Sequence, residues 1–166
     1  LQIWVNLPAK DKNVKPWYQH IKKIDIPTIN KEDGVIVKVL VGNVENIFSS
    51  IQTQSPVSIF DIQFSKPKQV TFEINRRQIA MIYIIDGEIK FSEVNKIAKK
   101  GQMVFFDQSS DEIQIISKSI RGSYLVLAGE PLNENVVRYG PFVTNTEHQM
   151  KQAIANFQNG EMGKLS

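Results

Sequence analysis

Apolar and polar residues alternate with a period of two through most of the chain, and this pattern restricts the fold more than any other feature. The run 35–41 (VIVKVLV) places its four valines on one face of an extended strand. The run 57–64 (VSIFDIQF) places Phe60, Ile62 and Phe64 on one face, with polar residues between them. Both runs are typical of strands that bury one face, so the first half of the chain is predicted to be β-structure.

Further strands are predicted through the rest of the chain. The segment 79–91 (IAMIYIIDGEIKF) contains Asp86-Gly87, a dipeptide that tolerates the positive φ angles of a tight turn, which predicts a β-hairpin. Residues 79–85 are apolar on both faces, so the first strand of that hairpin is predicted to lie inside a sheet. Other short strands are predicted at 70–74, 103–107, 112–117 and 124–128. Many short strands separated by turn signals predict an all-β sandwich or barrel.

One helix is predicted near the end of the sequence. Thr146 and Gln149 have the spacing of a capping box, and Gly160 is placed to end the helix. The apolar residues that share one face at i, i+3, i+4 and i+7 are Met150, Ala153, Ile154 and Phe157. An isolated amphipathic helix of this length is marginal in water, so its apolar face is expected to be buried on the sheet or on a partner.

Length and composition limit the class of protein. A chain of 166 residues with 42% apolar residues is predicted to form one domain with its own core. We expect a soluble, cytoplasmic protein without a membrane partner, because neither a transmembrane run nor a signal peptide is evident. The 20 basic residues are scattered among 17 acidic ones, which argues against a nucleic-acid surface. The absence of cysteine excludes disulfides and thiolate chemistry.

The first residues, LQIWVNLP, are predicted to form a strand that needs burial. Leu1, Ile3, Val5 and Leu7 share one face of this strand, and Trp4 lies on the other. Because an apolar edge without a partner is a template for strand addition, we expect these five residues to form an interface. The expected partner is a second copy of the chain, giving a homodimer, or another domain.

Three segments together resemble the pirin family of the cupin superfamily. They are 1–19 (LQIWVNLPAKDKNVKPWYQ), 82–91 (IYIIDGEIKF) and 127–154 (LAGEPLNENVVRYGPFVTNTEHQMKQAI). The resemblance covers nearly the whole chain and implies a cupin-type double-stranded β-helix, a jelly-roll barrel, with one C-terminal amphipathic helix. It implies that 129–131 end a barrel strand, that 136–139 return as a short strand, and that 140–142 turn the chain into the helix.

The resemblance also implies a domain organisation. Pirins are two cupin barrels in one chain, with iron held in the first barrel by three histidines and a glutamate. These ligands precede the strand that is similar to 1–8. We therefore expect 1–16 to be the last strand of that first cupin domain with its connection, and 17–166 to be the C-terminal cupin domain. The chain is expected to hold no metal or other cofactor of its own.

The residues present are poorly suited to an iron site. Such a site needs several imidazoles and a carboxylate around one metal. The sequence has two histidines, His20 and His148, and both are expected on the solvated surface. In 70–75 (VTFEIN), Val70 and Phe72 stand where the cupin pattern places histidines at i and i+2. The sequence therefore predicts a barrel without the family's metal ligands.

Other positions on these strands do not supply the missing ligands. Thr71 and Glu73 lie on the opposite face of their strand and offer a single carboxylate without nitrogen partners. Met103 and Phe105 stand where a cupin would need a ligand, and they are predicted to fill the core. No catalytic residue is predicted, because the sequence has neither a Gly-x-Ser-x-Gly motif nor a glycine-rich phosphate loop.

An apolar barrel interior can also be a binding pocket. Phe72, Met81, Tyr83 and Phe105 are predicted to line it, with the Tyr83 hydroxyl as its polar group. Packing of the same four side chains into a filled core is the alternative.

Two functions are compatible with these features. The first is a pirin-like, metal-free cupin domain that acts as a structural or protein-interaction module. The second is a fragment or subunit of an iron-dependent enzyme similar to quercetin 2,3-dioxygenase, whose active site lies in the N-terminal cupin domain.

Overall fold

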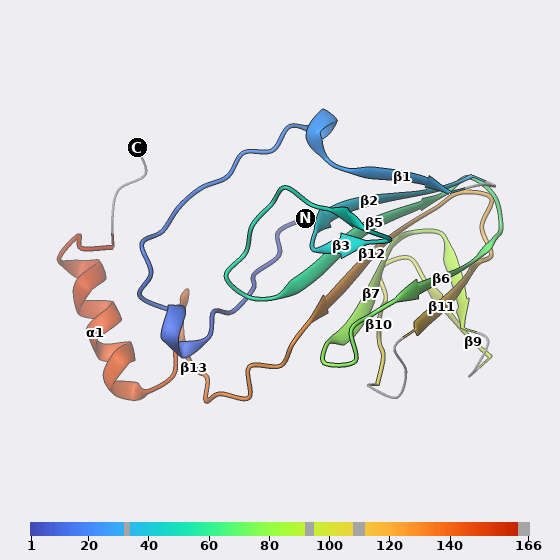
Figure 1. The fold of residues 1–166 in the computed structure, drawn as a ribbon. Helices are drawn as coiled ribbons and strands as arrows, with labels where there is room; N and C mark the ends of the chain where they lie inside the picture. The colour runs from blue at the N-terminus through green and yellow to red at the C-terminus, as the bar shows by residue number, and fades with distance from the viewer. Residues whose placement is uncertain (32–33, 92–94, 108–111, 163–166) are drawn as a thin grey trace. The chain divides into compact units, whose positions relative to one another are not determined.

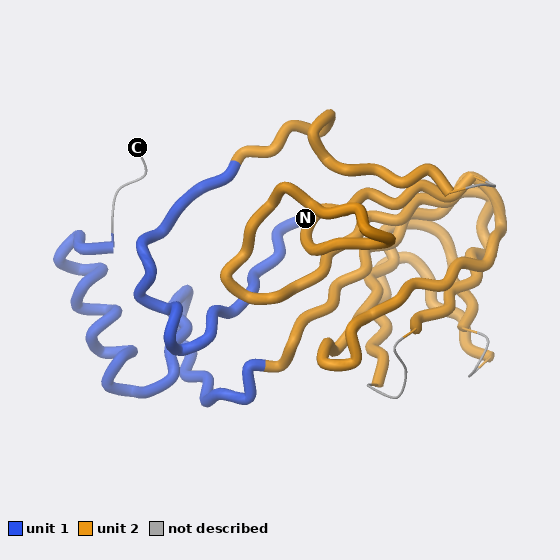
Figure 2. The backbone as a smooth tube through the Cα atoms, viewed as in Figure 1, with its two compact units in different colours: residues 1–19, 132–166 blue, residues 20–131 orange. Residues whose placement is uncertain are grey.

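The structure, a computed structural model, describes residues 1–31, 34–91, 95–107 and 112–162. The chain forms two compact units (Figure 2). The larger unit is His20–Pro131, and the smaller unit combines Leu1–Gln19 with Leu132–Ser166. The two ends of the sequence thus belong to one unit, and the strands of the middle belong to the other.

Two antiparallel sheets build the larger unit (Figure 1). The six-stranded sheet has the order β1 (Thr28–Lys31), β2 (Val35–Val41), β5 (Val57–Phe64), β12 (Gly122–Gly129), β7 (Ile79–Asp86) and β10 (Met103–Phe105). The four-stranded sheet has the order β6 (Gln69–Glu73), β11 (Glu112–Ser117), β8 (Glu88–Phe91) and β9 (Lys96–Lys99). A short hairpin of β3 (Asn43–Val44) and β4 (Ile47–Phe48) follows β2. The predicted all-β fold is confirmed.

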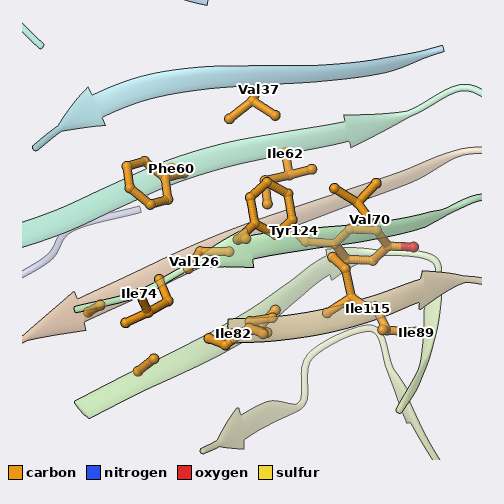
Figure 3. Close-up of a cluster of buried hydrophobic side chains, with 14 of the residues drawn as sticks. Val37, Phe60, Ile62, Val70, Ile74, Ile82, Ile89, Ile115, Tyr124 and Val126 are labelled. Carbon is orange, nitrogen blue, oxygen red and sulfur yellow. The ribbon is translucent and has the colours of Figure 1, made fainter. Parts of the chain in front are cut away.

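The main hydrophobic core contains side chains from both sheets (Figure 3). Val37, Phe60 and Ile62 from the six-stranded sheet are 0–1% exposed, and so are Ile89 and Ile115 from the four-stranded sheet. Each such side chain contributes roughly 1.5–3 kcal/mol by leaving water, so this interior supplies most of the driving force for folding. The alternation in β2 and β5 predicted these inward residues correctly.

One of the four valines in β2 lies on the other face of the sheet. The pairing between β2 and β5 shifts register between Val39 and Val41. Because a bulge of this kind adds a residue to one strand, the residues beyond it change face. Val41 consequently packs with Ile59 and Leu125 on the outer side of the six-stranded sheet. The prediction that all four valines share a face is wrong at this position.

The predicted hairpin at Asp86-Gly87 is also wrong. β7 is paired on both sides, by β12 and by β10, so it has no free edge to offer β8. β8 pairs instead with β11 and β9 in the other sheet. Gly87 adopts a φ of 86°, and a Cβ at this position would lie 3.0 Å from the Arg121 carbonyl oxygen. The turn therefore carries the chain from one sheet to the other.

The Tyr124 hydroxyl is a polar group inside this apolar core. Its Oη lies 3.0 Å from Ser117 Oγ and donates to the Glu88 carbonyl oxygen at 3.1 Å. The Tyr124 ring packs edge-on against Phe64, with centroids 5.5 Å apart. Gly122 leaves space for the hydroxyl, because a Cβ there would stand 2.1 Å from Oη. Burial raises the pKa of Tyr124, and the hydrogen bond with Ser117 opposes this effect.

In the smaller unit, the irregular stretch before the helix forms a β-hairpin. β13 (Val137–Tyr139) pairs with β14 (Phe142–Thr144) across a turn at Gly140 and Pro141. The predicted short strand at 136–139 is confirmed. The chain does not pass from this turn directly into the helix, because Phe142 begins a strand that pairs back on Tyr139.

The helix α1 (Glu147–Gln158) begins and ends where the sequence predicts. The Thr146 side chain caps it by accepting from the Gln149 N–H at 3.2 Å. At the other end, Gly160 adopts a φ of 72° and its N–H donates to the Phe157 carbonyl oxygen at 3.1 Å. No helix in the described part of the chain is long and apolar enough to cross a membrane.

The apolar face of α1 packs partly on the hairpin. Met150 is 5% exposed, while Phe157 remains 62% exposed although its ring meets Phe142 edge-on at a centroid distance of 5.6 Å. Burial of the helix face on other parts of the chain, as predicted, is therefore complete at its first turn and partial at its last.

A carboxylate links distant parts of the sequence in the smaller unit. Glu134 Oε2 accepts from the Ala9 N–H at 2.8 Å and from Asn145 Nδ2 at 3.0 Å. Asn145 Nδ2 also donates to the Asn135 carbonyl oxygen at 2.9 Å. Residues 127–146 thus end β12, build the hairpin and hold the N-terminal segment near the start of the helix.

Substitution Tyr124→Phe tests the hydroxyl in the core. We expect it to lower the free energy of unfolding by about 1 kcal/mol at neutral pH, because it removes a net hydrogen bond. Since the folded-state pKa is raised, the hydroxyl's contribution is fully present below the unfolded pKa of about 10 and is lost as pH rises through the folded pKa. Urea unfolding at about pH 8 and about pH 11 should therefore show a smaller difference between the proteins at the higher pH. An equal difference at both pH values would contradict the role assigned to Tyr124.

Candidate functional site

The positions where a cupin would place metal ligands are filled by apolar side chains. Val70 and Phe72 on β6 are 7% and 3% exposed, and both belong to the main core. They pair with Ile115 and Ile113 on β11, so apolar residues also face the interior across the ladder. These side chains offer no nitrogen or oxygen to a cation. Val70, Phe72 and the described residues opposite them therefore cannot serve as ligands of an iron centre.

The remaining ligand types lie elsewhere in the structure. Thr71 and Glu73 are exposed on the opposite face of β6, and His20 and His148 are exposed as well. His20 belongs to the larger unit and His148 to α1 in the smaller one. Within the residues that the structure describes, no group of three or more His, Asp or Glu side chains is arranged to hold a metal ion.

The structure does not bring together the four residues predicted to line a pocket. Phe72 points into the core, whereas Met81 and Tyr83 lie on the outer face of the six-stranded sheet. Phe105 is opposite Met81 in the ladder but is 66% exposed. The separation arises because β7 turns its even-numbered residues into the core and its odd-numbered residues away from it. Tyr83 therefore packs against the cluster around Leu125.

Met103 and Phe105 do not fill the core, contrary to the sequence-based expectation. Met103 is 43% exposed and Phe105 is 66% exposed. β10 is the last strand in the order of its sheet, and Val104 is its residue that packs against the core. The sequence analysis therefore assigned the wrong alternate residues of this strand to the core.

The outer face of the six-stranded sheet combines apolar packing with an ion pair. Val41, Ile59 and Leu125 are buried there without belonging to the main core. Beside them, Lys38 Nζ donates to Asp61 Oδ2 at 3.1 Å, and both side chains are about four-fifths buried. Asp61 Oδ1 is buried too, and no described residue donates to it. Burying a carboxylate with hydrogen bonds to only one of its two oxygens costs free energy. The outer face therefore holds a polar group within an apolar surface.

The N-terminal segment does not form the predicted strand. Residues 1–8 have no ladder with any described residue. A strand needs a ladder of backbone hydrogen bonds with a neighbour, and no described strand pairs with residues 1–8. The side chains predicted as an interface are exposed or half-buried: Leu1 at 88%, Ile3 at 40%, Trp4 at 68%, Val5 at 42%, and Leu7 in the half-buried class. Their role as an interface remains a prediction.

Sequence reasoning missed several structural elements near these surfaces. The hairpin of β3 and β4 turns at Glu45 and Asn46, which both have positive φ angles of 48° and 64°. Such a turn usually contains Asn-Gly or Asp-Gly. This turn contains Glu-Asn instead, so the sequence did not predict it. The ion pair between Lys31 and Glu45 joins this hairpin to β1. The sequence did contain one signal for the outer cluster, because residues 79–85 are apolar on both faces of their strand.

The chain is similar to known proteins along nearly its whole length. Residues 59–163 match the family model of the pirin C-terminal cupin domain. The chain is 34% identical to Pirin-1 of Arabidopsis thaliana and 35% identical to Pirin of Homo sapiens, over 98% of this chain in both cases. It covers 58% and 57% of those two relatives, little more than half of their length. The crystal structure of quercetin 2,3-dioxygenase from Acinetobacter baumannii matches it with a TM-score of 0.90 at 28% identity, over 98% of this chain and 56% of that one.

Truncation of two phenylalanines separates core packing from pocket lining. We expect Phe72→Ala to lower the free energy of unfolding by about 3–5 kcal/mol, because it leaves a cavity in a filled interior. The matched variant Phe105→Ala should cost less than about 1 kcal/mol, because its ring is largely exposed. Urea unfolding measures the free energy of unfolding of both variants. If Phe72→Ala does not fold, the milder substitution Phe72→Leu replaces it. Similar small costs at both positions would show that Phe72 borders an empty pocket.

Proposed function

Because this chain belongs to the pirin family, we propose that it acts as a structural or protein-interaction module whose own barrel binds no metal. The observation that carries the proposal is the filled interior of the larger unit. Val70 and Phe72, which stand where the resemblance implies cupin ligands, are buried among other apolar side chains. A metal at this place would displace packed hydrophobic groups and find no donor atoms.

Exposed apolar side chains support the interaction role. Leu1 and Trp4 are 88% and 68% exposed, and neighbouring apolar residues of the same segment are exposed as well. Several large apolar side chains exposed in one short segment are typical of an interaction site. The segment pairs with no strand of the described structure, so a partner that adds a strand would supply a ladder and cover the side chains together. The partner we propose is a second copy of the chain or another cupin domain.

The matched relatives favour a partner that is itself a barrel. The chain spans 56–58% of the length of the pirins and of the quercetin 2,3-dioxygenase that it resembles. What lies in the rest of those proteins is expected to be a cupin domain with the iron ligands. In this proposal, the chain supports such a domain and contributes no residue that touches the reacting atoms.

The second candidate function is enzymatic. The similarity to quercetin 2,3-dioxygenase of Acinetobacter baumannii favours a chain that works as half of an iron-dependent flavonol oxygenase. Its iron would then be supplied by the other cupin domain. Neither function places iron in this barrel, so the purified 166-residue chain with added iron should show no quercetin oxidation in either case. Oxidation that appears only when the other cupin domain is added would favour the enzymatic function, and turnover by this chain alone would contradict both.

Sedimentation tests the interaction role of the N-terminal segment. We expect the 166-residue chain to self-associate at micromolar concentration, and the variant Trp4→Asp to weaken the association by about tenfold or more, because it places a charge in the proposed contact. The matched control is Ile24→Asp, which changes an 89% exposed residue of the larger unit. A strict monomer would exclude a second copy of the chain as the partner, and an equal effect of both substitutions would remove the segment as the interface.

A further inference from the structure

A pocket of about 320 Å³ lies beside the hairpin of β3 and β4 in the larger unit. The end of β2, the hairpin, and the connection 49–56 to β5 line this hairpin pocket, and Figure 1 shows the hairpin, labelled at β3, with the connection that follows it. The volume is at the lower end of the range for small-molecule sites, which suits a single ring. None of the positions where the resemblance implies cupin ligands is in the described lining, so the hairpin pocket is a separate site.

Hydrogen bonds hold the wall of the pocket that follows the hairpin. The Ser49 N–H donates to the Gly42 carbonyl oxygen at 2.9 Å, and Ser49 Oγ donates to the Leu40 carbonyl oxygen at 2.6 Å. The same Oγ accepts from the Ile51 N–H at 3.0 Å. Gly42 has a φ of 85°, and a Cβ there would lie 3.1 Å from the Val57 carbonyl oxygen, so glycine permits the close approach. Because this wall is already formed, a ligand would not have to order it.

An aromatic ring faces the solvent at the hairpin pocket. Phe48 lines the pocket and is 68% exposed. Ile51 and Val57 add half-buried apolar side chains to the same lining. The faces of an aromatic ring carry partial negative charge, so they attract the C–H groups of a saturated ring that lies over them. The pocket therefore suits a ligand with one face made of C–H groups.

Two side-chain amides at the pocket are not fully used by the protein. The Asn43 amide makes no hydrogen bond with any residue that the structure describes. Gln78 Nε2 donates to the Pro56 carbonyl oxygen, and Gln78 Oε1 accepts from Ser58 Oγ, but both distances are 3.5 Å. These contacts are longer than the usual range of about 2.7–3.2 Å, so they are weak. Each amide contains a donor and an acceptor, which match the hydroxyl groups of a ligand because a hydroxyl also donates and accepts.

We propose that the hairpin pocket binds a six-membered ring that carries several hydroxyl groups, as in pyranose sugars. The C–H face of the ring would lie on Phe48, and its hydroxyls would pair with the amides of Asn43 and Gln78. Thr53 Oγ1 already donates to the Ser55 carbonyl oxygen at 2.8 Å, so it would accept from a further hydroxyl. The site requires neither a metal nor a partner chain, so it stands independently of the function proposed above.

An NMR titration with methyl pyranosides tests this site. The probes are the methyl pyranosides of glucose, galactose and mannose, and cyclohexanol is the control, because it is a six-membered ring with one hydroxyl. We expect at least one glycoside to shift the side-chain NH₂ signals of Asn43 and Gln78 saturably and to bind about fivefold or more tighter than cyclohexanol, because it forms more hydrogen bonds. Equal binding of cyclohexanol, or no saturable shift with any glycoside up to about 20 mM, would overturn the proposal.

A second comparison distinguishes a sugar from a polypeptide. The amides of Asn43 and Gln78 can also pair with peptide groups, which N-acetylalanine methylamide supplies without hydroxyls. We expect this probe to bind more weakly than the best glycoside, because it has no saturated ring to cover Phe48. Tighter binding of the methylamide than of every glycoside would assign the pocket to a polypeptide and overturn the proposal.

Variants of the hairpin locate the bound glycoside. Phe48→Ala and Asn43→Ala change exposed side chains, so folding should be preserved, and circular dichroism checks this. Each should weaken binding of the glycoside by about fivefold or more, because it removes the aromatic ring or one amide. The matched control is Ile47→Ala, which changes a 40% exposed residue of the same hairpin that is not in the described lining. Binding by the two variants that equals binding by the control would show that the glycoside binds elsewhere and would overturn the proposal.

Discussion

Close packing of apolar side chains from two sheets into one interior is the constraint on which the rest of the structure depends. Valine, isoleucine and phenylalanine from both sheets fill the space, and many of them are fully buried. Interiors packed in this way leave no room for a group that must be coordinated or solvated. The Tyr124 hydroxyl is accommodated because Ser117, the Glu88 carbonyl and the missing side chain at Gly122 provide partners and space.

The surfaces differ in what they offer. The N-terminal segment presents large exposed apolar side chains, and we propose that they contact another polypeptide. The edge between β9 and β10 presents a concave site with aromatic and polar side chains in its lining. The outer face of the six-stranded sheet holds the half-satisfied carboxylate of Asp61 within an apolar cluster.

Much of the fold could be predicted from local patterns, and the errors have a common cause. Alternation placed the strands and most inward residues of β2 and β5, and the cap at Thr146 with the glycine at Gly160 placed the helix ends. What local pattern does not contain is the identity of the neighbouring strand. Asp86-Gly87 has the chemistry of a hairpin turn, but β7 already has two neighbours, so the turn leads to another sheet. The same limit placed Met81 and Phe105 on the wrong side of their strands.

The site was predicted in part for the same reason. The apolar identities of Val70 and Phe72 can be read from the sequence, and their burial follows from the parity of β6. The pocket at the sheet edge depends on residues from β8 to β11 whose proximity is a property of the whole fold. The central claim is that the barrel has no place for a metal. Thermal unfolding with added ferrous iron under anaerobic conditions, against a chelator control, tests it most directly, because a ligand that binds the native state raises the midpoint. We predict identical midpoints, and a midpoint that rises with iron concentration would contradict the account.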